Sequence, residues 1–427
     1  MRIIFHGSGG EVGRSCIELV SSNDKERYLL DAGFKVHSGN PELPMKISNI
    51  SGIKGVFITH SHMDHIGALP YFHHQSLECP VIMTAMTKKL TKIMLNDSLH
   101  LELLRNHHPA YDRIDMERIM ESTKTVDYYH KMRYGDLEFE FAPSGHIPGS
   151  AMILFTMEGK NILYTGDLND IDTLLLHGTH LEFLKRHDID AMICESTYGN
   201  REHADRGSEE KRFVDSVKRV LSGGGSVVVP SFAIGRSQEL AILLSEAGID
   251  VPIYIDGMAK EISRIMVSKD IHIRNVDSLS NALSRVEFVN DKRKRHDLLK
   301  RQCVIITTSG MVSGGPVMEY IKHVWHDSRS AIFLTGFQAE GTNGRMLKEH
   351  SSAYIDGMEV NFSCRIESFD FSGHSGKSGL LRTIKAADPK SLILNHGDPD
   401  ALASLKKSCK PMIKDVLIAE NGTTLDL

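Results

Sequence analysis

The segment His60-Ser61-His62-Met63-Asp64-His65 places four side chains that can bind a metal ion within six positions. It follows the apolar run Gly55-Val56-Phe57-Ile58, so we expect it on the loop that leaves a strand. Imidazole and carboxylate ligands together suit Zn²⁺, and a loop lets neighbouring side chains diverge toward two ions. Two isolated histidines would more often be surface or core residues. Four donors at this spacing predict a metal site.

Three further candidate ligands, His146, Asp167 and His396, each follow an apolar run and stand next to or near a glycine. A hydrolytic two-metal site needs a carboxylate that bridges ions roughly 3.5–4 Å apart. We therefore predict Asp167 as the bridging ligand. Seven donors are too many for one tetrahedral ion, which predicts two Zn²⁺ per chain. Asp31, at the end of the run Tyr28-Leu29-Leu30, is expected to orient a histidine ligand or the activated water, the alternative being an ordinary turn residue.

The elements that must position these residues change character along the chain. Up to about residue 198, short β-rich runs alternate with turn signals, which predicts packed sheets, and one long helix is expected over 87–104. Strand and helix then alternate, which predicts a parallel sheet. The expected helices are 208–222 with Ser208 as N-cap, 238–247, 259–267 and 316–325. Short strands return after about residue 367, flanking a helix at 399–407. We predict a first domain made of 1–198 and 366–427, with 199–365 inserted as a second domain.

Composition sets limits on the class of protein. The chain has 427 residues, of which 41% are hydrophobic and 25% charged, as expected for two ordinary globular domains. No apolar stretch approaches the roughly 18 residues of a membrane span and the start lacks a secretory pattern, so we expect a cytoplasmic protein without membrane contact. Six cysteines without a C-x-x-C pair predict free buried thiols. The net charge of -5 means that any site for a polyanion must be local. The basic run at 292–295 is expected to be a solvated helix face.

The motifs together resemble a known family. H-x-H-x-D-H with the later His146 and Asp167 resembles the metallo-β-lactamase fold. Glu195-Ser196-Thr197-Tyr198-Gly199, Phe371-Ser372-Gly373-His374-Ser375 and Asn395-His396-Gly397-Asp398 are similar to the three signature motifs of the β-CASP nucleases. PSFAIGRSQE, IDGMAK, TTSGMVSGGP and GFQAEGTNGR resemble the cleavage and polyadenylation specificity factor branch, especially its short archaeal members without a KH domain. The resemblance runs from Gly7 to the C-terminus.

This resemblance implies an α/β chain, with a metallo-β-lactamase αββα sandwich and an inserted Rossmann-like β-CASP domain. It implies that His60, His62 and His146 hold one zinc ion, that Asp64, His65 and His396 hold the other, and that Asp167 lies between the ions. Glu195 would hydrogen-bond His374. A histidine in the position of His396 is similar to the branch that acts on RNA.

The chain also departs from the family pattern at three places. Gly376 stands where many relatives have Asp, Pro148 replaces a common Leu, and Asn169-Asp170 replace the usual Ser-Arg. None of the three changes removes a predicted ligand or His374. They affect the segments that would grip a nucleic-acid backbone.

The expected mechanism follows from these assignments. Two zinc ions would lower the pKa of a shared water toward neutrality, supply hydroxide for in-line attack and neutralise charge on the phosphate. The leaving ribose oxygen needs a proton, and His374 beside Glu195 fits the role of general acid. Candidate phosphate contacts are the hydroxyls and backbone of small-residue turns together with basic side chains: Ser231, Ser309, Gly310 and Ser375, with Arg236 or Arg264.

The sequence therefore predicts a zinc-dependent ribonuclease acting on single-stranded RNA, mainly as a 5′-to-3′ exonuclease with some internal cleavage. Two alternatives stay open, a zinc hydrolase of small molecules and a catalytically weak scaffold subunit of an RNA 3′-end processing complex. The inserted domain and His374 argue against the first. The presence of every predicted ligand argues against the second. The chain end IAENGTTLDL is expected to be an edge strand or a contact in a homodimer.

Overall fold

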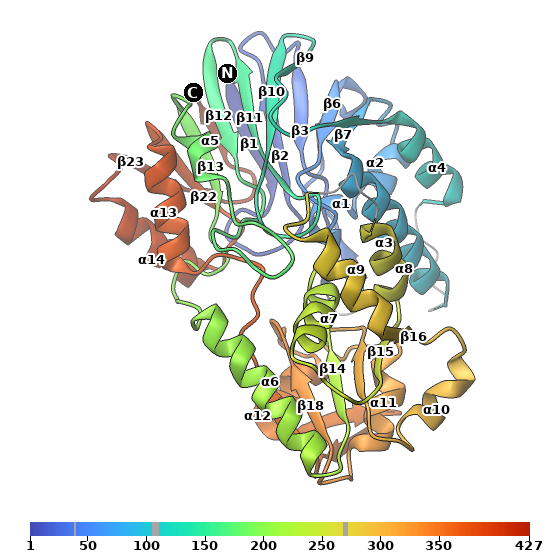
Figure 1. Ribbon diagram of the computed structural model, residues 1–427. Coiled ribbons are helices and arrows are strands. Elements are labelled where there is room, and N and C mark those ends of the chain that lie inside the picture. The colour runs from blue at the N-terminus through green and yellow to red at the C-terminus, as the bar shows by residue number, and fades with distance from the viewer. Residues whose placement is uncertain (38–39, 105–110, 268–271) are drawn as a thin grey trace. The chain divides into compact units, whose positions relative to one another are not determined.

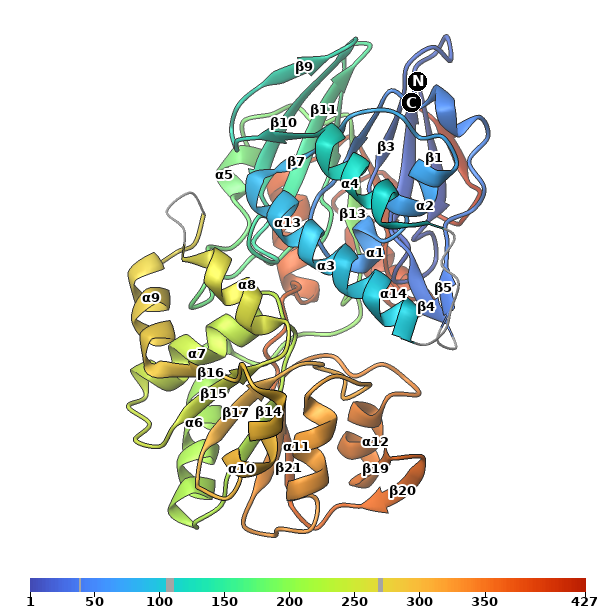
Figure 2. The ribbon, with the colours of Figure 1, turned by 90° about the vertical axis from the view of Figure 1, so that its right-hand side faces the viewer.

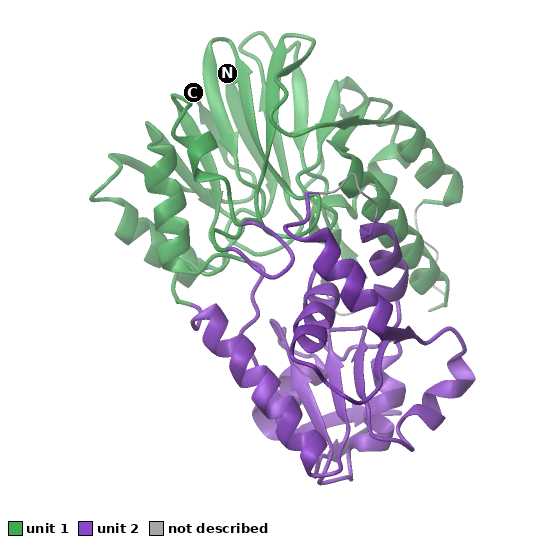
Figure 3. Cartoon of the chain, in the orientation of Figure 1, with its two compact units in different colours: residues 1–171, 178–202, 374–427 green, residues 172–177, 203–373 purple. Residues whose placement is uncertain are grey.

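A computed structural model describes residues 1–37, 40–104, 111–267 and 272–427. The chain forms two compact units (Figure 3). Unit 1 consists of residues 1–171, 178–202 and 374–427, and unit 2 of residues 172–177 and 203–373. The second unit is thus inserted into the first, and its main segment spans 203–373 where the sequence predicted 199–365. Within the described part of the chain, no helix is both long enough and apolar enough to cross a membrane.

Unit 1 contains two seven-stranded sheets (Figures 1 and 2). In order across the first sheet, the strands are β24 (Thr424–Asp426), β1 (Arg2–Gly7), β2 (Cys16–Val20), β3 (Arg27–Leu30), β6 (Gly55–Phe57), β7 (Val81–Thr84) and β8 (Thr123–Val126). The second sheet consists of β23 (Asp415–Ile418), β22 (Ser391–Asn395), β13 (Ala191–Glu195), β12 (Lys160–Tyr164), β11 (Ala151–Met157), β10 (Leu137–Pro143) and β9 (Met132–Tyr134). A small hairpin pairs β4 (Lys35–His37) with β5 (Asn40–Glu42). Strands β22, β23 and β24 thus belong to unit 1, which the chain re-enters at His374 rather than at residue 366.

The two sheets of unit 1 pack face to face because, along each strand, every second side chain points to the same face and these side chains are apolar on the inner faces. The inner faces share a core that includes Phe5, Phe57, Phe139 and Phe155, all buried. The outer face of the first sheet is covered by α1 (Met63–Ile66), α2 (Leu69–His74), α3 (Ala85–Leu104) and α4 (Arg113–Ser122) (Figure 2). The other outer face is covered by α5 (Leu181–Leu184), α13 (Lys377–Ala387) and α14 (Pro399–Cys409). This is the predicted αββα arrangement.

Unit 2 is built on a six-stranded sheet with all neighbouring strands parallel. Its order is β16 (Val286–Phe288), β15 (Ile253–Asp256), β17 (Val304–Thr307), β14 (Val227–Pro230), β18 (Ala331–Leu334) and β21 (Arg365–Ser368). Helices cover both faces, as expected for a Rossmann-like domain: α6 (Arg206–Ser222), α7 (Arg236–Glu246), α8 (Ala259–Met266), α9 (Val276–Arg285), α10 (Arg295–Leu298), α11 (Val317–Val324) and α12 (Asn343–His350) (Figures 1 and 2). The hairpin of β19 (Ser352–Ile355) and β20 (Met358–Asn361) follows α12.

Several local predictions can be compared with these elements. The long helix and the four later helices lie where the sequence placed them, within about two residues at most ends. The predicted N-cap Ser208 is wrong: α6 begins at Arg206, and Asp205 caps it by accepting a hydrogen bond from Ser208 N at 2.9 Å. A carboxylate caps a helix as well as a hydroxyl and also interacts with the helix dipole. The basic run is a short 3₁₀ turn at 292–294 rather than one helix face. All six cysteines are free and buried, as predicted.

Candidate metal centre

The predicted ligands are delivered by loops at strand ends of unit 1. The segment 60–65 follows β6, and its last three residues form the first turn of α1, with His62 as the residue before the helix. His146 follows β10, Asp167 follows β12 and His396 follows β22. Gly166 has a φ of +51°, and a Cβ there would lie 2.7 Å from Thr59 Cβ. The absence of a side chain at Gly166 thus lets the Asp167 loop approach the histidine loop.

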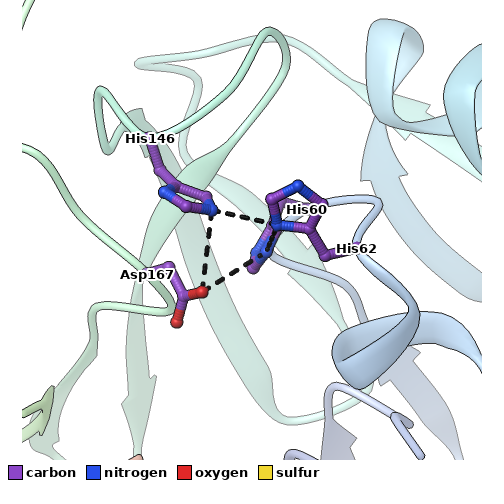
Figure 4. Close-up of side chains that lie close together, drawn as sticks. All are labelled: His60, His62, His146 and Asp167. Atoms are coloured by element: carbon purple, nitrogen blue, oxygen red, sulfur yellow. Dashed lines mark hydrogen bonds and ion pairs between the residues drawn. The ribbon is translucent and has the colours of Figure 1, made fainter. Parts of the chain in front are cut away.

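The first set of donors consists of His60, His62, His146 and Asp167 (Figure 4). His62 Nδ1 lies 3.2 Å from His60 Nε2 and 3.0 Å from His146 Nε2. Asp167 Oδ2 lies 3.6 Å from both His60 Nε2 and His146 Nε2. For a tetrahedral zinc site with bonds of about 2.05 Å, neighbouring donors are about 3.3 Å apart. The observed spacing therefore fits one such ion.

The second set consists of Asp64, His65, Asp167 and His396. Asp64 Oδ2 lies 3.4 Å from His396 Nε2 and 3.8 Å from His65 Nε2. Asp167 approaches the same histidines, with its Oδ2 3.5 Å from His65 Nε2 and its Oδ1 3.2 Å from His396 Nδ1. Asp167 thus belongs to both sets, which is the geometry that a bridging carboxylate requires.

Two further observations test whether these residues suit a cation. His65 Nε2 and Asp167 Oδ1 are buried and make no hydrogen bond to any described residue. Each lies within ion-pair distance of another donor, His65 Nε2 of Asp167 Oδ2 at 3.5 Å and Asp167 Oδ1 of His396 Nδ1 at 3.2 Å. An ion at the centre of the cluster would supply the bond that the neighbouring side chains do not make.

The electrostatics differ between the two sets. Burial lowers the pKa of His62 to about 4 and that of His60 well below its ordinary value, so both are neutral, the form that binds metals. Burial acts in the same direction on His65 and His396, but Asp167 and the other carboxylates nearby raise the pKa of both. The carboxylates of the second set therefore give it a negative potential that favours a cation, and a bound cation would displace the protons of His65 and His396. The residues fit zinc in both sets.

Asp31 holds one of these histidines in place. Its Oδ2 accepts hydrogen bonds from His65 Nδ1 at 2.7 Å and from the Tyr164 hydroxyl at 2.7 Å. Its Oδ1 accepts a hydrogen bond from Thr59 N at 2.8 Å. These contacts fix the tautomer of His65 and direct its Nε2 toward the other donors. Asp31 contacts a histidine donor and lies outside both donor sets.

His374 and Glu195 form a pair beside the two donor sets. Glu195 ends β13 and is buried. Its Oε1 accepts hydrogen bonds from His374 Nδ1 at 3.1 Å and from Leu168 N at 2.9 Å. His374 Nε2 lies 4.0 Å from Asp167 Oδ2. Burial alone would lower the pKa of His374, but the Glu195 carboxylate and its hydrogen bond raise it to about 9. The imidazole is thereby oriented and held in a form that can donate a proton.

The predicted phosphate contacts are divided between the units. Ser375 belongs to unit 1, where its buried hydroxyl donates to Asp170 Oδ1 and accepts from Asp170 N, both at 2.8 Å. This hydroxyl is engaged and is not presented to a phosphate. Ser231, Arg236, Arg264, Ser309 and Gly310 belong to unit 2. Arg236 has a side chain that is 9% exposed and paired with Glu239, and Arg264 donates to Asn290 Oδ1. Ser231 and Ser309 follow the adjacent parallel strands β14 and β17, and their contact with phosphate stays a prediction.

Two residues that support the site were not predicted from the sequence. Tyr164 and Thr59 both hydrogen-bond Asp31. A tyrosine at the end of an apolar strand is a signal in itself, because a buried phenol needs a hydrogen-bond partner. Asp170 was noted only as a departure from the family pattern, and its pairing with Ser375 was not foreseen.

The αββα fold with this donor set defines a metallo-hydrolase, and comparison with known proteins identifies the family. Three family models match: the beta-lactamase superfamily domain at 26–207, the Beta-Casp domain at 237–347 and the Zn-dependent metallo-hydrolase RNA specificity domain at 359–419. The chain is 38% identical over 403 residues to "Probable RNase MJ4" of Methanocaldococcus jannaschii, covering 93% of each chain. It is 35% identical to "RNase aCSPSF2" of Saccharolobus solfataricus, covering 99% of this chain and 84% of that protein.

Two other comparisons extend this result. "Transcription termination factor FttA" of Methanothermobacter thermautotrophicus is 32% identical, covering 93% of this chain and 67% of that protein. A crystal structure of a protein of unknown function from Enterococcus faecalis matches with a TM-score of 0.63 at 14% identity, over 100% of this chain and 99% of that one, which shows the shared fold. The chain belongs to the metallo-β-lactamase/β-CASP ribonuclease family, in its cleavage and polyadenylation specificity factor-like branch.

Proposed function

We propose that this protein is a zinc-dependent ribonuclease that hydrolyses RNA phosphodiester bonds with two zinc ions and a histidine general acid. The observation that carries the proposal is the shared position of Asp167. It belongs to two donor sets and lies beside the His374–Glu195 pair. A site of this kind combines two cation positions with a proton donor, the groups that phosphodiester hydrolysis needs.

The first proposed ion is held by His60, His62 and His146, and the second by Asp64, His65 and His396, with Asp167 shared. Zinc in these sets would supply the Lewis acidity that activates water at neutral pH and neutralises charge on the phosphate. Asp31 keeps His65 directed at the site.

His374 is proposed to protonate the oxygen that leaves from phosphorus. Without that proton the ribose oxygen would depart as a poor alkoxide. Glu195 keeps Nδ1 of His374 hydrogen-bonded, so Nε2 is the nitrogen on the side of Asp167. The same carboxylate stabilises the imidazolium form, as an orienting acid does beside a catalytic histidine.

RNA is the proposed substrate because of the similarity to known proteins. The relatives at 38% and 35% identity carry the name RNase, and the model that matches 359–419 is described as an RNA specificity domain. His396 is present where the branch acting on RNA has a histidine. We propose single-stranded RNA, degraded mainly from the 5′ end with some internal cleavage.

The alternatives are weaker on specific grounds. A small-molecule hydrolase would not need the inserted unit 2 or His374. A scaffold subunit would be expected to have lost ligands, whereas all seven predicted donors converge here. β24 is an edge strand paired only with β1 among the described strands, and its free edge is the proposed contact of a homodimer.

The proposal is tested by comparing initial rates on matched RNA and DNA single strands with the zinc-loaded protein. RNA should be cleaved much faster. Equal rates would indicate a general nuclease. Rapid turnover of a lactone or thioester with no cleavage of either strand would support the small-molecule alternative.

A further inference from the structure

Hydrogen bonds link the segment of unit 1 that follows the predicted bridging ligand to the segment that contains the predicted general acid. The first segment follows Asp167, and the second begins with His374. Ser375 N donates to Leu168 O at 2.9 Å, and the Ser375 hydroxyl makes two hydrogen bonds with Asp170. Three hydrogen bonds therefore join residues 168–170, which follow Asp167, to Ser375, which follows His374.

Asp170 lies at the centre of this set. Its side chain is only 4% exposed, and its Oδ1 accepts the Ser375 hydroxyl. Its Oδ2 accepts two hydrogen bonds from Arg382, at 2.9 Å from Nε and 2.5 Å from Nη2. A buried carboxylate that accepts three hydrogen bonds holds a defined orientation, because a rotation that breaks one of them leaves part of the buried charge without a hydrogen bond.

A glycine in α13 leaves room for the Asp170 carboxylate. Gly379 lies in the first turn of α13, and a Cβ at this position would lie 2.0 Å from Asp170 Oδ1. Any side chain there would displace Asp170. Arg382, one turn later on the same helix, has a side chain that is 56% exposed, so its ion pair contributes less than the buried contacts.

We propose that Asp170 and Ser375 are positioning residues that, with Gly379 and Arg382, fix His374 relative to Asp167. This inference rests on the proposed function, since it assigns the network to the general acid of that reaction. Ser375 is covalently next to His374, and the Glu195 oxygen that accepts from His374 also accepts from Leu168 N. The backbone of residues 168–170 is thus the common support of the imidazole and of the carboxylate that orients it.

The placement of His374 matters because proton transfer requires hydrogen-bond reach to the leaving oxygen. A displacement of about 1 Å can cost on the order of 10²-fold in rate. Asp170→Asn, Ser375→Ala and Gly379→Ala are each expected to slow RNA cleavage by about 10- to 100-fold. Arg382→Ala should have a smaller effect, and zinc content should stay unchanged in all four.

The experiment compares two phosphodiester substrates with different leaving groups in the zinc-loaded full chain. RNA has a ribose leaving oxygen that needs a proton, whereas bis(p-nitrophenyl) phosphate releases p-nitrophenolate, which does not. The variants should lose RNA cleavage and keep hydrolysis of the p-nitrophenyl ester. His374→Ala should show the same pattern, and adding Asp170→Asn to it should cause little further loss.

Ser378→Ala is the matched control, because Ser378 lies in the same helical turn and its hydroxyl donates to Glu202 at 2.6 Å instead of to Asp170. It should cleave both substrates like the unmodified protein. Equal losses on both substrates, loss of zinc, or full additivity with His374→Ala would overturn the positioning role. If the unmodified zinc-loaded protein fails to cleave RNA, the proposed function itself has failed, which is a different outcome.

Discussion

Removing the imidazole of His374 should separate proton donation from metal binding. In His374→Ala, the seven donors of the two sets are untouched, and Glu195 keeps hydrogen bonds from Leu168 N and Thr197 N. The fold and both zinc ions should therefore be retained. Loss of a general acid typically lowers the rate by about 10²–10⁴, or roughly 3–5 kcal/mol of transition-state stabilisation, while RNA binding changes little.

The assay is single-turnover cleavage of 5′-labelled RNA at saturating enzyme, with bound zinc measured by elemental analysis on the same sample. His60→Ala is the comparison, since it should lose metal and activity together. If His374→Ala loses a zinc ion, His374 is a ligand that acts through its Nε2, which lies 4.0 Å from Asp167 Oδ2. Cleavage at the unmodified rate with both ions bound would refute the assignment of the acid.

Glu195→Gln extends the same prediction to pH. Glu195 raises the pKa of His374 to about 9, so proton donation should persist to about that pH and be lost above it. Without the negative charge the pKa falls, and the alkaline limb of the pH–rate profile should move to lower pH. The rate at neutral pH should lie between those of the unmodified protein and His374→Ala. An unshifted alkaline limb would contradict the electrostatic role of Glu195.

Two further predictions concern the metal support and the direction of cleavage. Asp31→Asn should weaken zinc binding by about 10- to 100-fold through loss of the carboxylate that orients His65, measured by competition with a chelator, and unchanged affinity would exclude that role. On RNA labelled at the 5′ end, a 5′-monophosphate should be degraded faster than a 5′-triphosphate with early release of labelled mononucleotide, whereas ladders that shorten from the 3′ end would contradict 5′-to-3′ action.

The clustering of the predicted donors could be foreseen from the sequence because each residue is locally marked. His146, Asp167 and His396 all follow an apolar strand and lie beside a tight turn, and strand ends of one sheet gather at one edge. The period of the apolar residues likewise identified the helices and the switch from packed sheets to βα units. These signals depend on neighbouring residues in the chain.

The parts that could not be predicted depend on long-range contacts. Asp170 and Ser375 are 205 positions apart, and nothing near either residue indicates the other. As a result Ser375 was assigned to phosphate although its hydroxyl is taken up by Asp170. The N-cap of α6 was predicted wrongly for a different reason. Asp205 and Ser208 are both good capping residues, and the backbone conformation decides which of them caps the helix.

If two zinc ions act together at the two donor sets that share Asp167, RNA cleavage must depend on filling both sets. Protein freed of metal with a chelator would be reconstituted with increasing amounts of zinc, and bound zinc and RNA cleavage would be measured at each ratio. Cleavage should stay low while about one ion per chain is bound and reach its full rate only as the second is filled. Full cleavage at one bound ion, or no cleavage with both sets filled, would contradict the two-metal account.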